Sequence, residues 1–203
     1  MATSGRADFQ TVRRPPMQSK QTLAVIPPEP EVRFTFDGRE FLWRSESQAP
    51  APRKLSKVDD RLTAQTALAR VRRNEYLLYE GDFRNAKQLV SAMGRRVNRR
   101  REGGKLSPLE TFRAERVSRL REHETLSRVV VQLDAGYALQ NLKHAPLVSA
   151  ACTAAWGPST LPTIVSLKAL LGVIGAAEWQ KKGLPIRGLT GLLLPAYGVF
   201  LPT

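Results

Sequence analysis

The sequence predicts an α-rich α+β fold, in which an N-terminal β-hairpin precedes a basic three-helix bundle and a strand with two further helices follows it. Three observations lead to this prediction. An Asp-Gly pair separates two alternating aromatic segments, three stretches carry apolar residues at helical spacing, and a β-branched run begins the last part. A chain of 203 residues is long enough for one substantial domain or two small ones.

The hairpin is predicted over residues 32–45. Asp37-Gly38 is a strong signal for a two-residue turn, and with that turn Phe34 lies opposite Phe41. A lone hairpin is marginally stable in water, so we expect its apolar face to pack on the rest of the protein. That face gathers Val32, Phe34, Phe36, Phe41 and Trp43.

Two irregular segments flank the hairpin. Residues 1–31 contain Pro, Ser and Gln with little periodicity, which is typical of a disordered arm. Residues 46–61 include the run SQAPAPRK and are predicted to be a linker.

Residues 62–128 carry the pattern that predicts the three-helix bundle. The first helix is expected to run from a Thr63 cap to Glu80, with Gly81 as its stop. In the second helix, Asp82 is the predicted cap and apolar residues recur at helical spacing. The apolar residues of the second helix are Ala86, Leu89, Val90, Met93 and Val97.

The third helix has the clearest start signal of the chain. Ser107 is followed by Pro108 in the first helical position and by Glu110, which together form a capping box with the favoured proline. Short connections between the three helices predict an antiparallel bundle. The predicted core stripe of this helix is Leu109, Phe112, Val117, Leu120 and Leu126.

The last part, residues 129–203, is predicted to form a strand and two helices. Val129–Asp134 is a β-branched run of strand length. One helix is closed by Gly157, and the other begins after Ser166 and ends before Gly183.

The charge balance favours polyanionic partners. Lys and Arg number 32 against 18 Asp and Glu, a net charge of +14, which favours nucleic acid first and an anionic membrane surface second. The densest cluster is GRRVNRRREGGK, and a solvated helix end is its alternative interpretation. The predicted contacts to an anionic substrate or nucleic acid are Arg84, Lys87, Arg95, Arg96, Arg99, Arg100 and Arg101.

Motifs for catalysis, metal binding or cofactor binding are not found in the sequence. Cys152 is a single cysteine and the two histidines are His123 and His144, so neither a disulfide nor a Cys- or His-based metal site is expected. The chain lacks a Gly-rich nucleotide fingerprint and a Ser/His/Asp set. It also lacks a secretory signal and an apolar run of the ~20 residues that span a bilayer, which predicts a soluble, cytoplasmic protein.

Several phrases of the chain, taken together and in order, resemble a known family. They are LTAQTALARVRRNEYLLYEGDFRNAKQLVSAMGRRV, LDAGYALQNLKHAPLVSAACTAAWG, VSLKALLGVIGAAEWQKKGLPI and PAYGVFLPT. They look like the amino-terminal half of a bacterial class I S-adenosylmethionine-dependent methyltransferase of the small-domain type. The resemblance covers residues 32–203, and its specificity comes from the order of the phrases, since none is a catalytic motif.

The resemblance implies a function and a missing partner. In that family, a catalytic domain with an acidic Gly-rich cofactor loop follows the YGVF phrase, and this chain ends at Thr203 without that loop. The resemblance therefore implies an accessory, substrate-recognition region that is truncated before the C-terminal catalytic domain and is inactive alone. S-adenosylmethionine is the cofactor implied for the full-length family, and RNA or protein is the implied methyl acceptor.

Two other interpretations stay open at this point. The chain can be a free-standing basic protein that binds RNA or a ribonucleoprotein and has no enzymatic activity. It can also be a fragment without a function. The first alternative predicts an affinity that falls steeply with salt.

Overall fold

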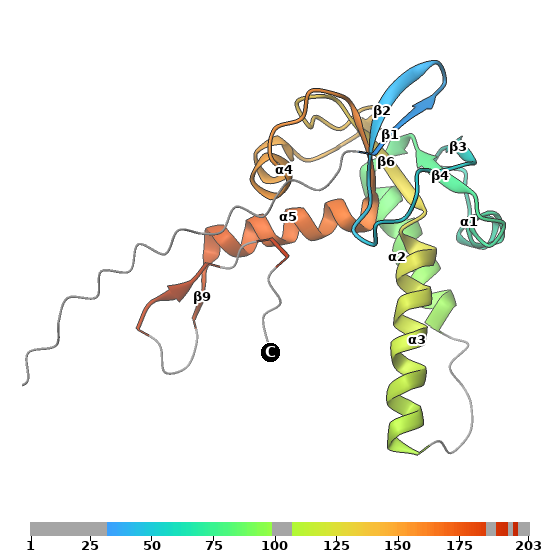
Figure 1. Ribbon diagram of the computed structural model, residues 1–203, viewed down its shortest axis with the longest axis vertical. Helices are drawn as coiled ribbons and strands as arrows, with labels where there is room; N and C mark the ends of the chain where they lie inside the picture. Colours follow the sequence, from blue (N-terminus) through green and yellow to red (C-terminus); the bar gives the residue numbers. More distant parts are fainter. Residues whose placement is uncertain (1–31, 99–106, 186–189, 195–196, 199–203) are drawn as a thin grey trace, which may run out of the picture. The chain divides into compact units, whose positions relative to one another are not determined.

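A computed structural model describes residues 32–98, 107–185, 190–194 and 197–198, and a six-stranded mixed sheet lies at its centre (Figure 1). The strand order is β1-β2-β8-β6-β4-β3. These strands are β1 (Val32–Phe36), β2 (Arg39–Arg44), β3 (Leu55–Val58), β4 (Tyr76–Tyr79), β6 (Val129–Leu133) and β8 (Thr163–Ser166). Two small sheets pair β5 (Gly81–Asp82) with β7 (Leu142–Lys143) and β9 (Leu184–Pro185) with β10 (Leu192–Leu193).

Helices connect the parallel strands, because parallel neighbours cannot be joined by a tight turn. Strands β3, β4 and β6 are parallel neighbours. Helix α1 (Ala64–Val71) joins β3 to β4, and helices α2 (Phe83–Asn98) and α3 (Pro108–Leu126) lie between β4 and β6 in the chain. Helix α4 (Ser149–Trp156) precedes β8, and α5 (Leu167–Lys182) follows it. Strand β8 is antiparallel to β6 and parallel to β2.

The β1-β2 hairpin has the register that the Asp-Gly pair predicts. Phe34 pairs with Phe41, and Val32 pairs with Trp43. Asp37 and Gly38 have φ values of 51° and 72°, which lie in the left-handed region that such a turn requires. The hairpin is an edge of the larger sheet, because β2 also pairs with β8.

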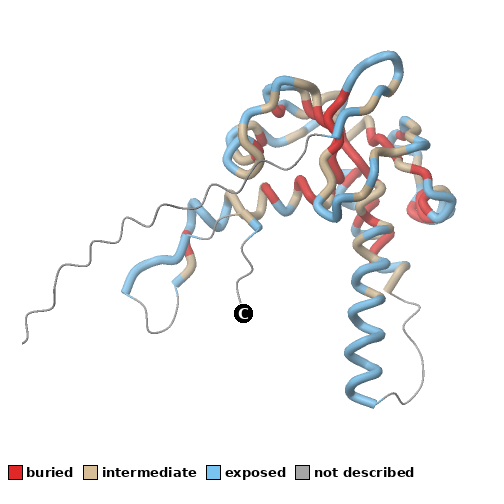
Figure 2. The backbone as a smooth tube through the Cα atoms, in the orientation of Figure 1, coloured by how far each residue is buried: buried red, intermediate tan, exposed pale blue. Residues whose placement is uncertain are grey.

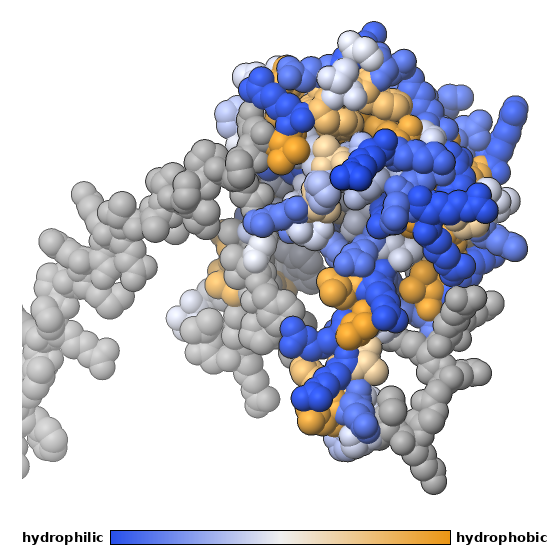
Figure 3. All heavy atoms as spheres, turned by 45° about the vertical axis from the view of Figure 1, so that its right-hand side comes forward, coloured by the Kyte–Doolittle hydropathy of each residue, from blue (hydrophilic) through white to orange (hydrophobic). Residues whose placement is uncertain are grey.

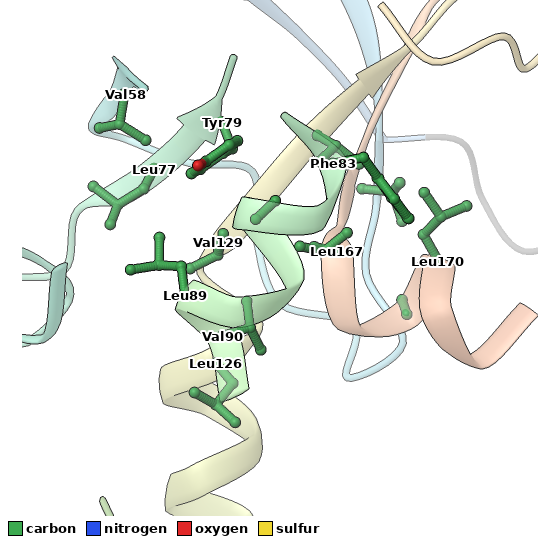
Figure 4. Packing of buried hydrophobic residues seen from close by; sticks show 14 of the residues in the cluster. Val58, Leu77, Tyr79, Phe83, Leu89, Val90, Leu126, Val129, Leu167 and Leu170 are labelled. Carbon is green, nitrogen blue, oxygen red and sulfur yellow. The ribbon is translucent and has the colours of Figure 1, made fainter. Parts of the chain in front are cut away.

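The sheet carries a core on each face, since successive side chains of a strand point to opposite sides. On the larger side, helices α2 and α5 cover the strands (Figure 4). Leu77 of β4 faces this larger core, whereas its neighbour Leu78 faces the smaller one. The smaller core consists of Phe41, Trp43, Leu78, Val130 and Ile164.

The sheet curls around its smaller core. Phe34 of β1 and Leu55 of β3, from opposite ends of the strand order, pack against the same buried cluster. Lys57 of β3 also donates a hydrogen bond to the carboxylate of Asp37 in the β1-β2 turn, at 2.9 Å. The ammonium group of Lys57 lies 6.0 Å from the centre of the Phe36 ring. These contacts bring the two edge strands together, so the small core is closed without a covering helix.

The predicted three-helix bundle is wrong. The first helix ends at Val71 and does not continue to Glu80, because Tyr76–Tyr79 forms strand β4. The sequence YLLY fits a helix and a strand equally well as a short apolar run. A parallel strand buried on both faces favours such a continuous run, and Leu77 and Leu78 are both buried.

Two further strands of the six-stranded sheet lie where the sequence predicted none. Strand β3 falls inside residues 46–61, the predicted linker, and β8 precedes the helix that begins after Ser166. Each has four residues, so its pairing with neighbouring strands, rather than a long periodic pattern, determines its structure. The predicted arm, residues 1–31, lies outside the described residues, and the predicted domain boundaries stay predictions.

Helix α3 has its predicted cap but not its predicted core stripe. Ser107 accepts a hydrogen bond from the backbone N–H of Glu110, and the Glu110 carboxylate accepts one from the backbone N–H of Ser107. Figure 2 shows that most of this helix is exposed. Leu126 is buried, but Leu109, Phe112, Val117 and Leu120 are 57%, 58%, 46% and 58% exposed. Their expected burial is therefore wrong, because α3 extends beyond the elements that could cover them.

Candidate anion-binding surface

Helix α2 provides the candidate surface for anions. Its apolar side is buried through Phe83, Ala86, Leu89, Val90 and Met93. Packing of that side fixes which residues face outward. The exposed residues include Arg84, Lys87, Arg95 and Arg96, and the sixteen residues of the helix include neither Asp nor Glu. The helix therefore presents cations to solvent without carboxylates of its own to neutralise them.

The two ends of α2 differ in their electrostatic surroundings. At the first turn, the Asp82 carboxylate accepts a hydrogen bond of 2.7 Å from the backbone N–H of Arg84 and lies 2.6 Å from Nδ1 of His144. These contacts, the one to His144 first, lower the pKa of Asp82. Arg95 lies about 16 Å along the helix axis from Arg84, at a rise of 1.5 Å per residue. The first turn is thus beside the carboxylate that precedes the helix, whereas the last turns face a carboxylate of α3, Glu122.

The cations near the end of α2 are held by their own helix. Nη1 of Arg95 donates to the hydroxyl of Ser91 at 2.9 Å, and Nη1 of Arg96 donates to the carbonyl of Ala92 at 3.3 Å. A guanidinium group has five N–H donors, so each side chain retains donors for a ligand. Cations are also favoured at a helix C-terminus, because the partial charge there is negative.

A groove of about 660 Å³ lies beside Arg95, where α2, α3 and α5 meet. It contains one cation that the sequence did not predict as a contact, Lys168 in the first turn of α5. A cation in the first turn of a helix is disfavoured, because the partial charge at the helix N-terminus is positive. This unfavourable position is the sequence signal that would have singled out Lys168. The groove is lined by Val90, Ser91, Gly94, Arg95, Asn98, Glu122, Leu126 and Lys168.

A carboxylate also lies in this groove. Oε1 of Glu122, on α3, accepts a hydrogen bond from the side-chain amide of Asn98 at 3.2 Å. An anion in the groove must therefore approach from the side of Arg95 and Lys168. The arrangement favours a ligand that spans the rim of the groove over one that fills it.

The predicted contact residues fall into two groups. Arg84, Lys87, Arg95 and Arg96 all lie on α2 and are exposed. Arg99, Arg100 and Arg101 lie outside the described residues. The structure thus places four of the predicted cations on one helix and adds Lys168 from a distant part of the chain.

A second cluster of ionisable groups lies at the carboxyl ends of β3 and β4. The hydroxyl of Tyr79 donates to Oδ1 of Asp60 at 2.7 Å, which lowers the pKa of Asp60. Glu80 accepts a hydrogen bond from the side-chain amide of Asn141 at 3.1 Å. Hydrogen bonds within the protein thus engage these carboxylates and join the ends of the strands to the β5-β7 sheet.

The part of the chain that the structure describes offers few other reactive groups. Its His, Cys, Asp and Glu side chains form no group of three that could hold a metal ion. Cys152 is buried, and burial raises the pKa of its thiol to about 11, which disfavours the nucleophilic thiolate. Its helices include none that combines the length and apolar character needed to cross a membrane.

The arrangement of α2 and its groove resembles a binding surface more than a catalytic centre. The exposed side of a helix with several cations, next to a groove with a further lysine, belongs to the class of surfaces that bind anions. No protein family, curated protein or solved structure matches the chain. The resemblance to methyltransferases therefore stays a prediction.

Proposed function

We propose that this chain is the substrate-recognition region of an S-adenosylmethionine-dependent methyltransferase and that the second half of α2 binds the phosphate backbone of an RNA substrate. The cations of α2, which occur without a carboxylate in the same helix, carry this proposal. The resemblance of four ordered phrases to that family supports the enzyme class. In this proposal the protein acts in the cytoplasm.

Each group has a positioning role in the proposed function. Arg95 and Arg96 form charge-assisted hydrogen bonds with phosphate oxygens, and Lys168 joins Arg95 as a second cation at the groove. Such contacts hold a substrate in place and carry little sequence information. The methyl group would come from S-adenosylmethionine bound by the catalytic domain of the full-length family, so this chain alone is expected to be inactive.

The RNA-binding part is tested by fluorescence anisotropy with a labelled single-stranded RNA oligonucleotide over a range of salt concentrations. The double variant Arg95→Ala/Arg96→Ala is expected to bind more weakly and to reduce the slope of log affinity against log salt by about 1.4, at roughly 0.7 per phosphate contact. The matched control is Arg113→Ala/Arg119→Ala on α3, where four glutamates accompany four arginines. Equal losses for both variants would contradict a site on α2.

The enzyme class needs separate tests. Isothermal titration with S-adenosylmethionine is expected to show no binding to this chain, and tight binding would refute the proposed division of labour. The intact mass of the protein from its own cell distinguishes the proposal from a free-standing RNA-binding protein. A product larger by about one domain of 50–250 residues supports the methyltransferase. A product of 22.6 kDa supports the free-standing alternative.

A further inference from the structure

A row of apolar side chains on α3 lies open to solvent. Every residue from 107 to 117 is exposed, although the helix continues to Leu126. Figure 3 shows hydrophobic and hydrophilic side chains side by side along this lower part of the molecule. Large exposed apolar side chains that gather on one surface, with polar residues around them, mark interaction sites more often than chance.

Helical spacing places these side chains on one face. Residues three, four, seven and eleven positions apart lie on the same side of a helix. Leu109 and Leu120, eleven residues apart, therefore form the middle line of this face. Phe112 lies to one side of that line and Val117 to the other. Leu126 and Glu122 lie on another side, where they pack near Gly94 of α2. The four apolar residues therefore face away from the protein's own core. We call Leu109, Phe112, Arg113, Arg116, Val117 and Leu120 the α3 face.

The α3 face is positively charged between its apolar ends. Arg113 and Arg116 fall in the middle of the face by helical spacing. The carboxylates of α3 lie away from these two arginines: Glu110 accepts hydrogen bonds from Ser107 in the capping box, Glu115 lies outside the face, and Glu124 follows Leu120 at the C-terminal end of the face. A partner that covers this face must therefore supply apolar groups at its ends and negative charge between them.

The face is formed before any partner binds. The capping box and Pro108 stabilise the start of α3 without tertiary contacts. The guanidinium group of Arg116 lies 6.0 Å from the centre of the Phe112 ring, so a cation and an aromatic side chain are already placed together. Because the helix need not fold on binding, a partner loses less affinity to ordering.

The last turns of α3 lead into a groove. This groove has a volume of about 690 Å³ and lies between α3, the loop that follows β2 and the start of β4. Leu120 belongs both to the α3 face and to the lining of this groove, which also includes Arg53, Tyr76 and the carboxylates Glu46 and Glu124. A segment that lies along the α3 face therefore has a recess for its end.

From this arrangement we infer that the α3 face docks an amphipathic helix of a protein partner, with acidic side chains between apolar anchors. Apolar anchors of such a helix would cover Phe112, Val117 and the two leucines, while its carboxylates would pair with Arg113 and Arg116. A second copy of this chain fits poorly, because α3 against α3 would place these arginines opposite their own counterparts. The inference does not depend on the proposed RNA-binding function, since it concerns a different helix.

The test uses two synthetic 18-residue helical peptides with the same leucine anchors. One peptide carries glutamates beside the leucines, and the other carries lysines at those positions. Fluorescence anisotropy with the full chain is expected to show about tenfold tighter binding of the glutamate peptide, from two charge pairs of modest strength. The variant Arg113→Glu/Arg116→Glu is expected to reverse this preference.

Two controls separate the α3 face from the general positive charge of the protein. Arg95→Glu/Arg96→Glu on α2 changes the net charge by the same amount and is expected to leave the preference unchanged. Leu120→Asp is expected to weaken the binding of both peptides. Because Leu120 is exposed, this variant is expected to fold, and circular dichroism checks that it does. If the α2 variant alters the preference as much as the α3 variant does, the inference is overturned.

Sedimentation equilibrium tests the competing occupant. We expect the full chain to be a monomer at micromolar concentration. A dimer that Leu120→Asp dissociates would show that a second copy covers the α3 face and would overturn the inference. A preference for the glutamate peptide that Arg113→Glu/Arg116→Glu reverses, in a monomeric protein, supports it.

Discussion

Helices α2 and α3 have similar lengths and clear start signals, yet they expose opposite kinds of side chain. Helix α2 buries its apolar stripe and presents cations, whereas α3 exposes most of its apolar residues among charges of both signs. Both stripes were predicted to be core. Hydrophobic periodicity thus identifies a helix face that can be covered, but not whether this chain covers it.

The difference arises from where each helix lies. Helix α2 packs beside the sheet and contributes Leu89 and Val90 to the larger core (Figure 4). Helix α3 reaches that core only near its end, through Leu126. Its earlier turns extend past the core (Figure 1), and its capping box stabilises them without such contacts. The apolar side chains of these turns are thus exposed to solvent.

Truncation of one apolar residue on each helix should give the largest contrast. Met93→Ala on α2 is expected to lower the free energy of unfolding by about 2–5 kcal/mol, because Met93 is fully buried. Phe112→Ala on α3 is expected to change it by less than about 0.5 kcal/mol, since the side chain is exposed. Urea denaturation measures both values. A large loss for Phe112→Ala would show that the α3 face is covered in the free protein.

The effect of acid on the free energy of unfolding should differ between a buried carboxylate of the core and an exposed one on α3. The hydrogen bond from Arg70 is the main cause that lowers the pKa of buried Glu75 from 4.5 to about 2. Glu75 therefore stabilises the fold above pH 4.5, and this contribution is lost as the pH falls through about 2. Glu75→Gln is expected to cost about 1–3 kcal/mol at neutral pH and to reduce the acid dependence.

The control for this prediction is Glu110→Gln in the exposed capping box of α3. It removes a carboxylate whose pKa is also lowered, through hydrogen bonds from Ser107, but which lies at the surface. Urea denaturation between pH 2 and 7 measures both variants. Equal changes in acid dependence would contradict the distinction between buried and exposed carboxylates.

A small addition at the contact between the two helices should stabilise the protein. A methyl group at Gly94 on α2 would lie 3.5 Å from side-chain atoms of Glu122 and Leu126 on α3, an ordinary packing distance. Gly94→Ala is expected to raise the free energy of unfolding by about 0.5–1 kcal/mol, from the higher helix propensity of alanine. Thermal denaturation measures the change. A lower melting temperature would show that α2 and α3 leave no room for the added methyl group.

Removal of a helix cap should have the smallest and most local effect. Ser107→Ala is expected to cost the first turn of α3 about 1 kcal/mol and to speed amide exchange there, while the melting temperature of the core stays unchanged. Thr63→Ala is the matched variant, because Thr63 caps α1 and α1 packs on the core. It is expected to lower the melting temperature. If Ser107→Ala lowers it as well, the start of α3 contributes to the core.

Local signals in the sequence determined part of this structure. The Asp37-Gly38 turn specified the register of the hairpin, and Ser107, Pro108 and Glu110 specified the start of α3. The apolar spacing on α2 also identified its buried side, and with it the outward position of the predicted cations. In the turn and the cap the interacting groups lie within a few residues of one another, and on α2 the helical spacing of the apolar residues is itself a local pattern.

The tertiary structure decided the remainder. Strands β3, β4 and β8 have four residues each, and their structure depends on hydrogen bonds to strands that are distant in sequence. The same holds for the groove that Lys168 and Arg95 both line and for the exposure of the α3 face. Such contacts depend on how the whole chain packs. The sequence by itself therefore determined the caps, the turn and the sides of α2, whereas packing alone decided what is covered.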